Sequence, residues 1–247
     1  MVRAIFSDFD ETLLNYHSDK NFFDNYQIGI LRKLNEKNIE FCIVTGRCVS
    51  FFRQFPELLE YVSYILASNG SCIYDVKNEK FIYHKCIGTQ EVNELIDYAH
   101  QNQFYYYLNV YGNQYYESKD VDLSNCEQFI LSFSNKDLER VLDDTSHIPY
   151  ISFNNICKHG DRYTIDINHY IVSKGNSITV LCKYLDILLE DTVCFGDSYN
   201  DVSMFKVVGN SISVGNALEK VKILANKVTL SSAENGVFKY IEDHFLR

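Results

Sequence analysis

Residues 2–14 read VRAIFSDFDETLL, and this stretch decides how the rest of the chain is interpreted. Its first part, residues 2–7, is a short apolar run of the kind that forms a buried strand. The run ends at Asp8, and a second acid follows at Asp10. Ligands of open parallel sheets bind beyond the carboxyl ends of the strands. The stretch therefore predicts a strand that delivers two acids to a binding site.

The sequence outward from this stretch alternates strands and helices. Further strands are expected at residues 39–44, 64–67, 192–195, 212–214 and 227–230. Apolar residues at helical spacing, such as Ile28, Leu31 and Leu34, separate several of these runs. Strand, helix and strand joined by short links predict parallel pairing, with helices on both faces of the sheet. The expected fold class is α/β, with a Rossmann-like parallel-sheet core.

The middle of the chain follows a different pattern. Gly112-Asn113 is a two-residue hairpin signal between expected strands at residues 105–110 and 114–117. Hairpins join antiparallel strands, so this region predicts an α+β insert and not a continuation of the parallel sheet. Two more strands of the insert are expected at residues 148–154 and 163–167.

The helices of the insert set its expected extent. One amphipathic helix is predicted around residues 92–99, and Ser134 is predicted to cap a second helix, with Asp137 completing a capping box. The expected domains are a core of residues 1–84 and 171–247 and an inserted domain of residues 85–170.

Composition narrows the classes of function. The chain has 247 residues, of which 46% are apolar and 23% charged, the proportions of a globular protein. Its formal net charge of −10 disfavours nucleic acid as a partner. The sequence has no apolar run of about 18 residues, so no membrane span is expected. Eight cysteines without a Cys-x-x-Cys pair indicate free thiols and a cytoplasmic location.

The polar residues at the expected strand ends suit phosphoryl transfer. Asp8 and Asp197 can supply the carboxylates that Mg²⁺ binds together with phosphate and water. Thr45 and Lys174 could hold the phosphate oxygens and stabilise their charge. A nucleophilic Asp8 would split hydrolysis into two steps through an aspartyl phosphate. Asp10 would protonate the leaving alkoxide and later deprotonate water.

Four segments together resemble the motifs of the haloacid dehalogenase superfamily, at the spacing of its Cof-type sugar-phosphatase branch. They are DFDETLL at residues 8–14, VTGR at 44–47, SKG at 173–175 and FGDSYND at 195–201. In that branch a cap domain is inserted between the second and third motifs, where the predicted insert lies in this chain. The resemblance covers the whole chain and is strongest at the four motifs.

The resemblance implies roles for three acids. Asp8 matches the nucleophile of the family. Asp10 matches the general acid/base, whose backbone carbonyl also faces magnesium. Asp197 matches a metal ligand, so the implied Mg²⁺ site consists of Asp8, Asp10 and Asp197.

The resemblance also implies a phosphate site and its support. Thr45, Lys174 and Asn200 match residues that bind the phosphate. Thr12 matches the residue that braces the first motif loop, and Asp201 matches a carboxylate just outside the metal site. The same acid is also a candidate helix N-cap, and it could serve both purposes.

One departure from the family pattern lies at Glu11, where the family often has glycine. Other branches accept a side chain at this position, so the resemblance still implies an active enzyme. An added carboxylate near the metal could change the metal affinity or the preferred substrate charge. Arg47 is interpreted as pairing with surface acids and is left outside the predicted site. Lys158 and Lys183 compete with Lys174 for the phosphate.

The tyrosines and the histidines of the chain can each be interpreted as structural or as functional residues. The tyrosines of residues 105–116 are favoured as sheet packing, and a stacking surface for a sugar or an aromatic cofactor is the alternative. His17, His84, His147 and His159 have no metal-ligand spacing, so they are interpreted as ordinary side chains.

These observations predict a Mg²⁺-dependent phosphoric monoester hydrolase whose cap opens and closes over the sheet edge. The expected partner is a small phosphorylated metabolite, either a sugar phosphate or a phosphorylated cofactor such as pyridoxal phosphate. A monomer is compatible with the sequence. Two alternatives stay open, a phosphotransferase or mutase on the same core and a catalytically weak regulator that binds sugar phosphates. A receiver-like signalling module is disfavoured, since such modules are shorter and have no cap.

Overall fold

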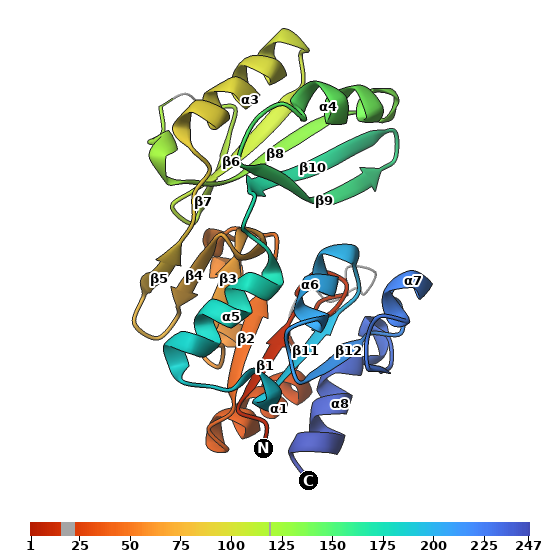
Figure 1. Ribbon diagram of the computed structural model, residues 1–247. Coiled ribbons are helices and arrows are strands. Elements are labelled where there is room, and N and C mark those ends of the chain that lie inside the picture. The colour runs from red at the N-terminus through yellow and green to blue at the C-terminus, as the bar shows by residue number, and fades with distance from the viewer. Residues whose placement is uncertain (16–22, 119) are drawn as a thin grey trace.

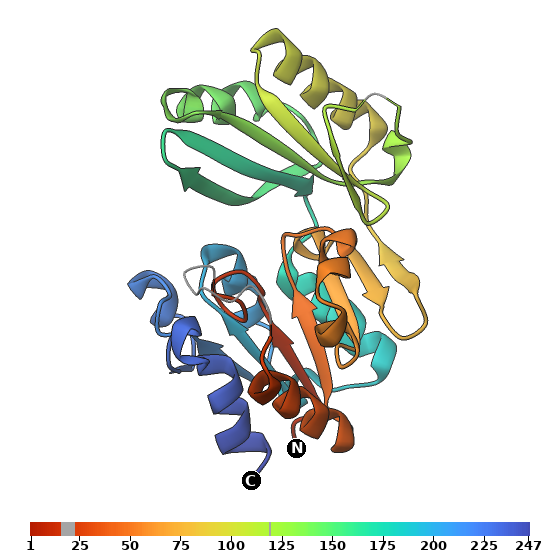
Figure 2. The same cartoon turned by 180° about the vertical axis from the view of Figure 1, so that it is seen from behind.

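The computed structural model describes residues 1–15, 23–118 and 120–247, so His17 lies outside the described residues. The chain forms two sheets, each with its own helices, one above the other in the view of Figure 1. Both chain termini lie at the end of the lower part that is remote from the upper one, as Figure 2 shows from behind. The lower part is the core and the upper part is the insert.

The core sheet has eight strands in the order β13-β12-β11-β1-β2-β3-β4-β5. Pairing is parallel from β13 to β3 and antiparallel at β4 and β5. The strands are β1 Ala4–Ser7, β2 Glu40–Val44, β3 Tyr64–Ala67, β4 Cys72–Asp75, β5 Lys80–His84, β11 Thr192–Gly196, β12 Asn210–Ser213 and β13 Lys227–Val228. The predicted parallel core is confirmed, and the hairpin of β4 and β5 extends it by two strands that the sequence did not predict.

Strand β1 lies in the middle of the sheet because its side chains are buried on both faces. Ile5 packs into one apolar cluster, whereas Ala4 and Phe6 pack into the cluster on the opposite face. Ser7 pairs with Phe195 of β11 on one side and with Ile43 of β2 on the other. This register brings the carboxyl ends of three strands level with one another.

Helices cover both faces of the core sheet, as predicted. Helices α1 and α8 pack on one face, whereas α5 and α6 pack on the other (Figure 1). The helices of the core are α1 Asn25–Glu36, α2 Pro56–Leu59, α5 Lys174–Leu185, α6 Val202–Phe205, α7 Glu219–Lys222 and α8 Gly236–Phe245. Among the described helices, none combines the length and the hydropathy of a membrane span.

The insert is an antiparallel five-stranded sheet in the order β7-β6-β8-β10-β9. Its elements are α3 Thr89–Gln101, β6 Tyr105–Val110, β7 Asn113–Tyr116, β8 Cys126–Ser134, α4 Leu138–Thr145, β9 Ile151–His159 and β10 Arg162–His169. Helices α3 and α4 cover the face away from the core, and the other face points toward it (Figure 1). Tyr106 is buried and stacks on Phe129 with ring centroids 5.3 Å apart, which agrees with tyrosine as sheet packing.

Two local predictions for the insert were wrong. The hairpin turn is Tyr111-Gly112, one residue earlier than predicted, and both residues have positive φ, 47° and 73°. Asn113 instead starts β7 and pairs with Val110. Ser134 does take the N-cap position of the short 3-10 helix Asn135–Asp137 before α4, but within the described residues its side chain makes no capping hydrogen bond, so the predicted capping box does not form.

Two short links join the insert to the core. The first runs from the end of β5 at His84 to the start of α3 at Thr89, and the second from the end of β10 at His169 to the start of α5 at Lys174. We propose that the cap extends over residues 85–170, which places both domain boundaries in these links.

Candidate active site

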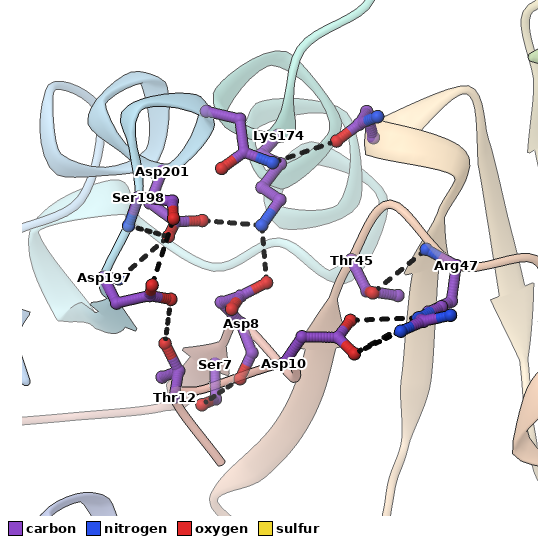
Figure 3. A network of polar contacts seen from close by, with 12 residues as sticks. Ser7, Asp8, Asp10, Thr12, Thr45, Arg47, Lys174, Asp197, Ser198 and Asp201 are labelled. Carbon is purple, nitrogen blue, oxygen red and sulfur yellow. Dashed lines mark hydrogen bonds and ion pairs between the residues drawn. The ribbon is translucent and has the colours of Figure 1, made fainter. Parts of the chain in front are cut away.

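The site begins with the loops that follow β1, β2 and β11, because their strands end level with one another. Asp8, Thr45 and Asp197 are the residues just after the three strands. The backbone N–H of Asp8 donates to the carbonyl of Phe195 at 3.0 Å and ties the first loop to β11. Figure 3 shows these side chains facing one another at the edge of the sheet.

Lys174 lies between two acids at the centre of the site (Figure 3). Its Nζ lies 2.6 Å from Asp8 Oδ1 and 2.6 Å from Asp201 Oδ1, and its side chain is 1% exposed. Lys174 is the first residue of α5. Ser173 caps the N-terminus of this helix, because its side chain accepts a hydrogen bond from the Asn176 N–H. The arrangement brings together Asp8, Lys174 and Asp201 as predicted.

Helix α5 is held close to α6 by a glycine. A Cβ at Gly175 would lie 2.2 Å from the carbonyl oxygen of Ser203, so only glycine fits against this backbone. The Gly175 N–H also donates to Ser203 Oγ at 3.1 Å. This close packing fixes the position of Lys174 next to it.

The competing lysines lie elsewhere. Lys183 is exposed near the end of α5, and Lys158 is exposed on β9 of the cap. Lys174, by contrast, is buried against Asp8 and Asp201. Its role as the lysine that binds the phosphate stays a prediction.

Burial and charge set the protonation of this cluster. Burial raises the pKa of the Asp8 carboxyl well above its usual range, and the Lys174 ammonium opposes this effect. Burial also raises the pKa of Asp197, with Asp201 adding to it. Burial alone would lower the pKa of Lys174, but its carboxylate partners outweigh burial and raise it. One ammonium therefore faces three acids, and a further cation would stabilise their ionised forms.

Asp197 is oriented by two hydroxyl groups. Thr12 Oγ1 donates to one of its carboxylate oxygens at 2.7 Å, and Ser198 Oγ donates to the other at 3.0 Å. Thr12 thus braces the first motif loop against β11. Asp201 Oδ2 accepts from the backbone N–H groups of Asp197 and Ser198, each at 2.9 Å. The N-cap of this capping box is Ser198, and Asp201 is its third residue, with no side-chain capping bond to α6 among the described residues. The other carboxylate oxygen of Asp201 pairs with Lys174.

Asp10 faces a residue that the sequence analysis left out. Arg47 Nη2 lies 2.8 Å from Asp10 Oδ1, and the Arg47 guanidinium also stacks over Phe51 at 4.6 Å from the ring centroid. The exclusion of Arg47 was therefore wrong, because its acid partner is Asp10 itself. The sequence did contain a signal for this pair. Arg47 lies three residues after the second strand, and that strand ends at the same sheet edge as the strand that precedes Asp10.

Thr45 and Asn200 are linked to the cap through the loop after β3. Thr45 is fully buried, and its Oγ1 accepts from the Arg47 N–H at 3.1 Å. Asn200 Nδ2 donates to Asn69 Oδ1 at 3.2 Å, and Asn69 Nδ2 donates to Asp166 Oδ2 of β10 at 3.0 Å. A chain of three side chains thus connects the fourth motif to the cap. Asn69 and Asp166 were missed because neither follows a strand that carries a motif.

The carboxylates fit a divalent cation. Asp8, Asp197 and Asp201 each offer an oxygen, and these oxygens lie within 4.8 Å of one another. Oxygen donors from one or two acids are what Mg²⁺ takes in addition to substrate and water. Three acids face one ammonium, so a divalent cation would also neutralise their excess negative charge.

A cleft of about 550 Å³ lies between the core edge and the cap sheet. The core contributes Asp8, Asp10, Glu11, Gly46, Arg47, Asp197, Ser198 and Asn200, and the cap contributes Tyr107, Gln114, Ile130, Asn155, Cys157, His159, Thr164 and Asp166. Its volume is typical of sites for small molecules. Tyr107 and His159 thus lie where they could contact a ligand in this cleft.

The structure gives a reason for the family glycine at the position of Glu11. The backbone of Glu11 has φ 57°, in the left-handed region that glycine adopts without a steric penalty. Glu11 accepts this conformation, and its carbonyl accepts from Asn216 Nδ2 at 2.8 Å. The added carboxylate lines the cleft beside Asp10.

The fold and the site together define a hydrolase with acids gathered at the carboxyl edge of a parallel sheet. The family of haloacid dehalogenase-like hydrolases matches residues 5–148 and 111–241. The chain belongs to this family, and the Cof-type assignment made from the four segments is confirmed with it.

Curated relatives of the chain are named as phosphatases. The 5-amino-6-(5-phospho-D-ribitylamino)uracil phosphatase YcsE of Bacillus subtilis is 24% identical over 243 residues, which cover 97% of this chain and 94% of that protein. A phosphoglycolate phosphatase of Methanosarcina mazei is 26% identical over 223 residues, 87% of each chain. A solved structure of a haloacid dehalogenase-like hydrolase from Bacteroides thetaiotaomicron has the same fold, with a TM-score of 0.86 and 23% sequence identity. The superposition covers 99% of this chain and 100% of that chain.

Proposed function

We propose that the protein is a Mg²⁺-dependent phosphatase that transfers the phosphoryl group of a small phosphomonoester to Asp8 and then to water. The observation that carries the proposal is the convergence of Asp8, Asp197 and Lys174 from three separate segments at one buried point. Two acids that can share a cation beside an ammonium are the minimum that this chemistry requires.

The first step needs an ionised Asp8 held in line with the phosphorus. Lys174 favours the ionised form and fixes the side chain by its contact at 2.6 Å. Thr45 and Asn200 would hold the phosphate oxygens, together with backbone N–H groups of the loop after β2. Mg²⁺ bound by Asp8, Asp197 and the Asp10 carbonyl would neutralise phosphate charge, which otherwise repels the nucleophile.

The proton transfers fall to Asp10. Its side chain is 31% exposed and reaches the cleft, whereas the side chain of Asp8 is 8% exposed. Asp10 would give its proton to the leaving alkoxide and later take one from the water that attacks the aspartyl phosphate. Arg47 would orient Asp10 through the ion pair and the stacking on Phe51.

We propose that the cap selects the substrate. We also propose that the leaving group of this substrate carries hydroxyl groups. The cap wall of the cleft consists largely of amide, hydroxyl and imidazole groups, which bind hydroxyl groups by hydrogen bonds. Sugar phosphates and phosphorylated cofactors have this chemistry, and the substrate in the name of the Bacillus subtilis relative carries a hydroxylated ribityl chain. A cytoplasmic location, where such metabolites occur, completes the proposal.

The test is hydrolysis of p-nitrophenyl phosphate and of a panel of phosphomonoesters, with Mg²⁺ and with a chelator. We expect activity that depends on Mg²⁺ and that Asp8→Asn abolishes. Free phosphate as the product separates a phosphatase from a phosphotransferase or mutase. Activity that survives in Asp8→Asn would remove Asp8 as the nucleophile, and wild-type protein that binds sugar phosphates without hydrolysing them would favour the regulator.

A further inference from the structure

A second cluster of metal-ligating side chains lies at the junction of core and cap. Cys72 is the first residue of β4 and His84 the last of β5, and they are direct cross-strand partners. Glu127 reaches them from β8 of the cap sheet. One ligand atom of each residue lies within 4.8 Å of the other two. None of the three residues lines the active-site cleft.

The cluster is shielded from water although it contains a carboxylate. Cys72 and Glu127 are fully buried, and the side chain of His84 is 20% exposed. A carboxylate in a protein interior needs a cation or several donors to offset its lost hydration. The His84 ring lies against Glu127, with Nε2 at 3.0 Å from Oε1.

Hydrogen bonds account for the carboxylate only in part. The Gly112 N–H donates to Glu127 Oε1 at 3.0 Å, and Ser68 Oγ donates to Oε2 at 3.3 Å. The Nε2 atom of His84 is buried and, among the described residues, has no partner in hydrogen-bond geometry despite its short distance to Glu127. An imidazole nitrogen that faces a carboxylate and a thiol without a directed hydrogen bond is available to a metal ion.

We propose that Cys72, His84 and Glu127 bind a zinc-type transition metal ion at this junction. A thiolate, an imidazole and a carboxylate are the donors that Zn²⁺ takes in proteins, with water able to fill the fourth position. Mg²⁺ prefers oxygen donors alone, so this site and the carboxylate site at Asp8 differ in the ion they select.

Binding at this site has two physical consequences. Burial raises the pKa of the Cys72 thiol well above its usual range, and Glu127 adds to the effect, so the ion must displace a proton and its affinity increases with pH. The ligands come from both parts of the chain, two from core strands and one from the cap. A bound ion therefore ties the cap to the core beside the link that starts after His84.

Co²⁺ is the probe for the test, because only a thiolate ligand gives a thiolate-to-cobalt charge-transfer band. The metal-free protein would be titrated with Co²⁺ in excess Mg²⁺, which occupies the oxygen site. We expect one cobalt per chain with this band in the wild type, no band in Cys72→Ser, and an affinity at least about tenfold weaker in His84→Gln. Cys182→Ser, which removes a buried thiol of α5, is the matched control and keeps the band.

A second measurement guards against misfolded variants. Circular dichroism identifies the variants that fold, and His84→Gln carries the test if Cys72→Ser does not fold. Zn²⁺ should raise the thermal unfolding midpoint of the wild type and of Cys182→Ser, but not of the variants that lack a ligand. A wild-type titration without a thiolate band, or a band that persists in Cys72→Ser, would overturn the proposal. Neither readout depends on phosphatase activity, so the two proposals fail separately.

Discussion

The two walls of the cleft are built differently. On the core wall, Asp8 is 8% exposed and pairs with Lys174, which lies behind the lining with a side chain that is 1% exposed. Asp10 and Arg47 of the same wall are 31% and 45% exposed and pair with each other. The cap wall is mostly neutral, and its acid, Asp166, is held by the amide of Asn69 from the core. The charged core wall suits the proposed phosphoryl chemistry, whereas the mostly neutral cap wall suits the proposed binding of the leaving group.

The largest expected effect concerns Asp10, the acid on the core wall to which we assign proton transfer. Asp10→Asn should lower kcat by roughly 10²- to 10⁴-fold, the usual contribution of a general acid/base. The loss should be smaller for p-nitrophenyl phosphate than for an alkyl phosphate, because p-nitrophenolate leaves without protonation. Steady-state rates of phosphate release with both substrates check this. Equal losses would assign Asp10 a role other than protonation of the leaving group.

The next effect tests whether the core wall depends on its buried cation. Lys174→Met leaves Asp8 and Asp201 without their ammonium, so the free energy of unfolding should fall by about 3–5 kcal/mol in the absence of divalent ions. Mg²⁺ should restore part of this loss, since it can neutralise the same acids. Urea unfolding measures both values. Lys183→Met, an exposed change on the same helix, is the control, and an equal loss there would contradict the comparison.

A smaller effect concerns the acid of the cap wall. Burial raises the pKa of Asp166, and hydrogen bonds from Asn69 and neighbouring amides oppose it only in part. A raised pKa means that the folded protein keeps the proton longer than the unfolded chain. The contribution of Asp166 to stability is therefore present below its unfolded pKa and is lost as the pH rises through its folded pKa.

Asp166→Asn, which stays neutral, should accordingly gain stability relative to the wild type between pH 4 and pH 7, on the order of 1 kcal/mol. Urea unfolding across this pH range measures the difference. Asp97→Asn, at an exposed position of α3, should leave the pH dependence unchanged. A gain for Asp166→Asn that is the same at every pH would rule out ionisation as its cause.

The smallest effect concerns Glu11, in the loop after β1 on the core wall. Glu11→Gly should raise the free energy of unfolding by no more than about 1 kcal/mol, because relief of the left-handed strain is partly offset by the flexibility of glycine in the unfolded chain. Thermal unfolding with and without Mg²⁺ measures it. A clear loss of stability would mean that the Glu11 side chain holds the loop through its contacts.

The core wall could be predicted from the sequence to a greater extent than the cap wall. Carboxyl ends of parallel strands meet at one edge, so Asp8, Thr45 and Asp197 could be grouped before the structure was known. Lys174 and Asp201 followed from the resemblance of their segments to the family motifs. In each of these cases the backbone topology alone brings the residues together.

The remaining contacts depend on where individual side chains point. Arg47 and Asp10 follow strands that end at one sheet edge, but the topology does not show that their side chains pair. The bridge from Asn69 to Asp166 joins a core loop to strand β10 of the cap, and no periodicity encodes their relative positions. The shifted turn at Tyr111 has a similar origin, since a tyrosine with positive φ breaks the rule that glycine and asparagine occupy such turns. Prediction of the cap therefore reached its strands and helices but not its contacts.

The close fit of Gly175 against Ser203 has a mechanical consequence. Lys174 directly follows the link of residues 170–173 that leaves the cap, so strain in that link would act on the residue that pairs with Asp8. Because the first turn of α5 packs against α6 at Gly175, Lys174 is anchored to the core. The position of the Asp8–Lys174 pair is therefore set by the contact between two core helices.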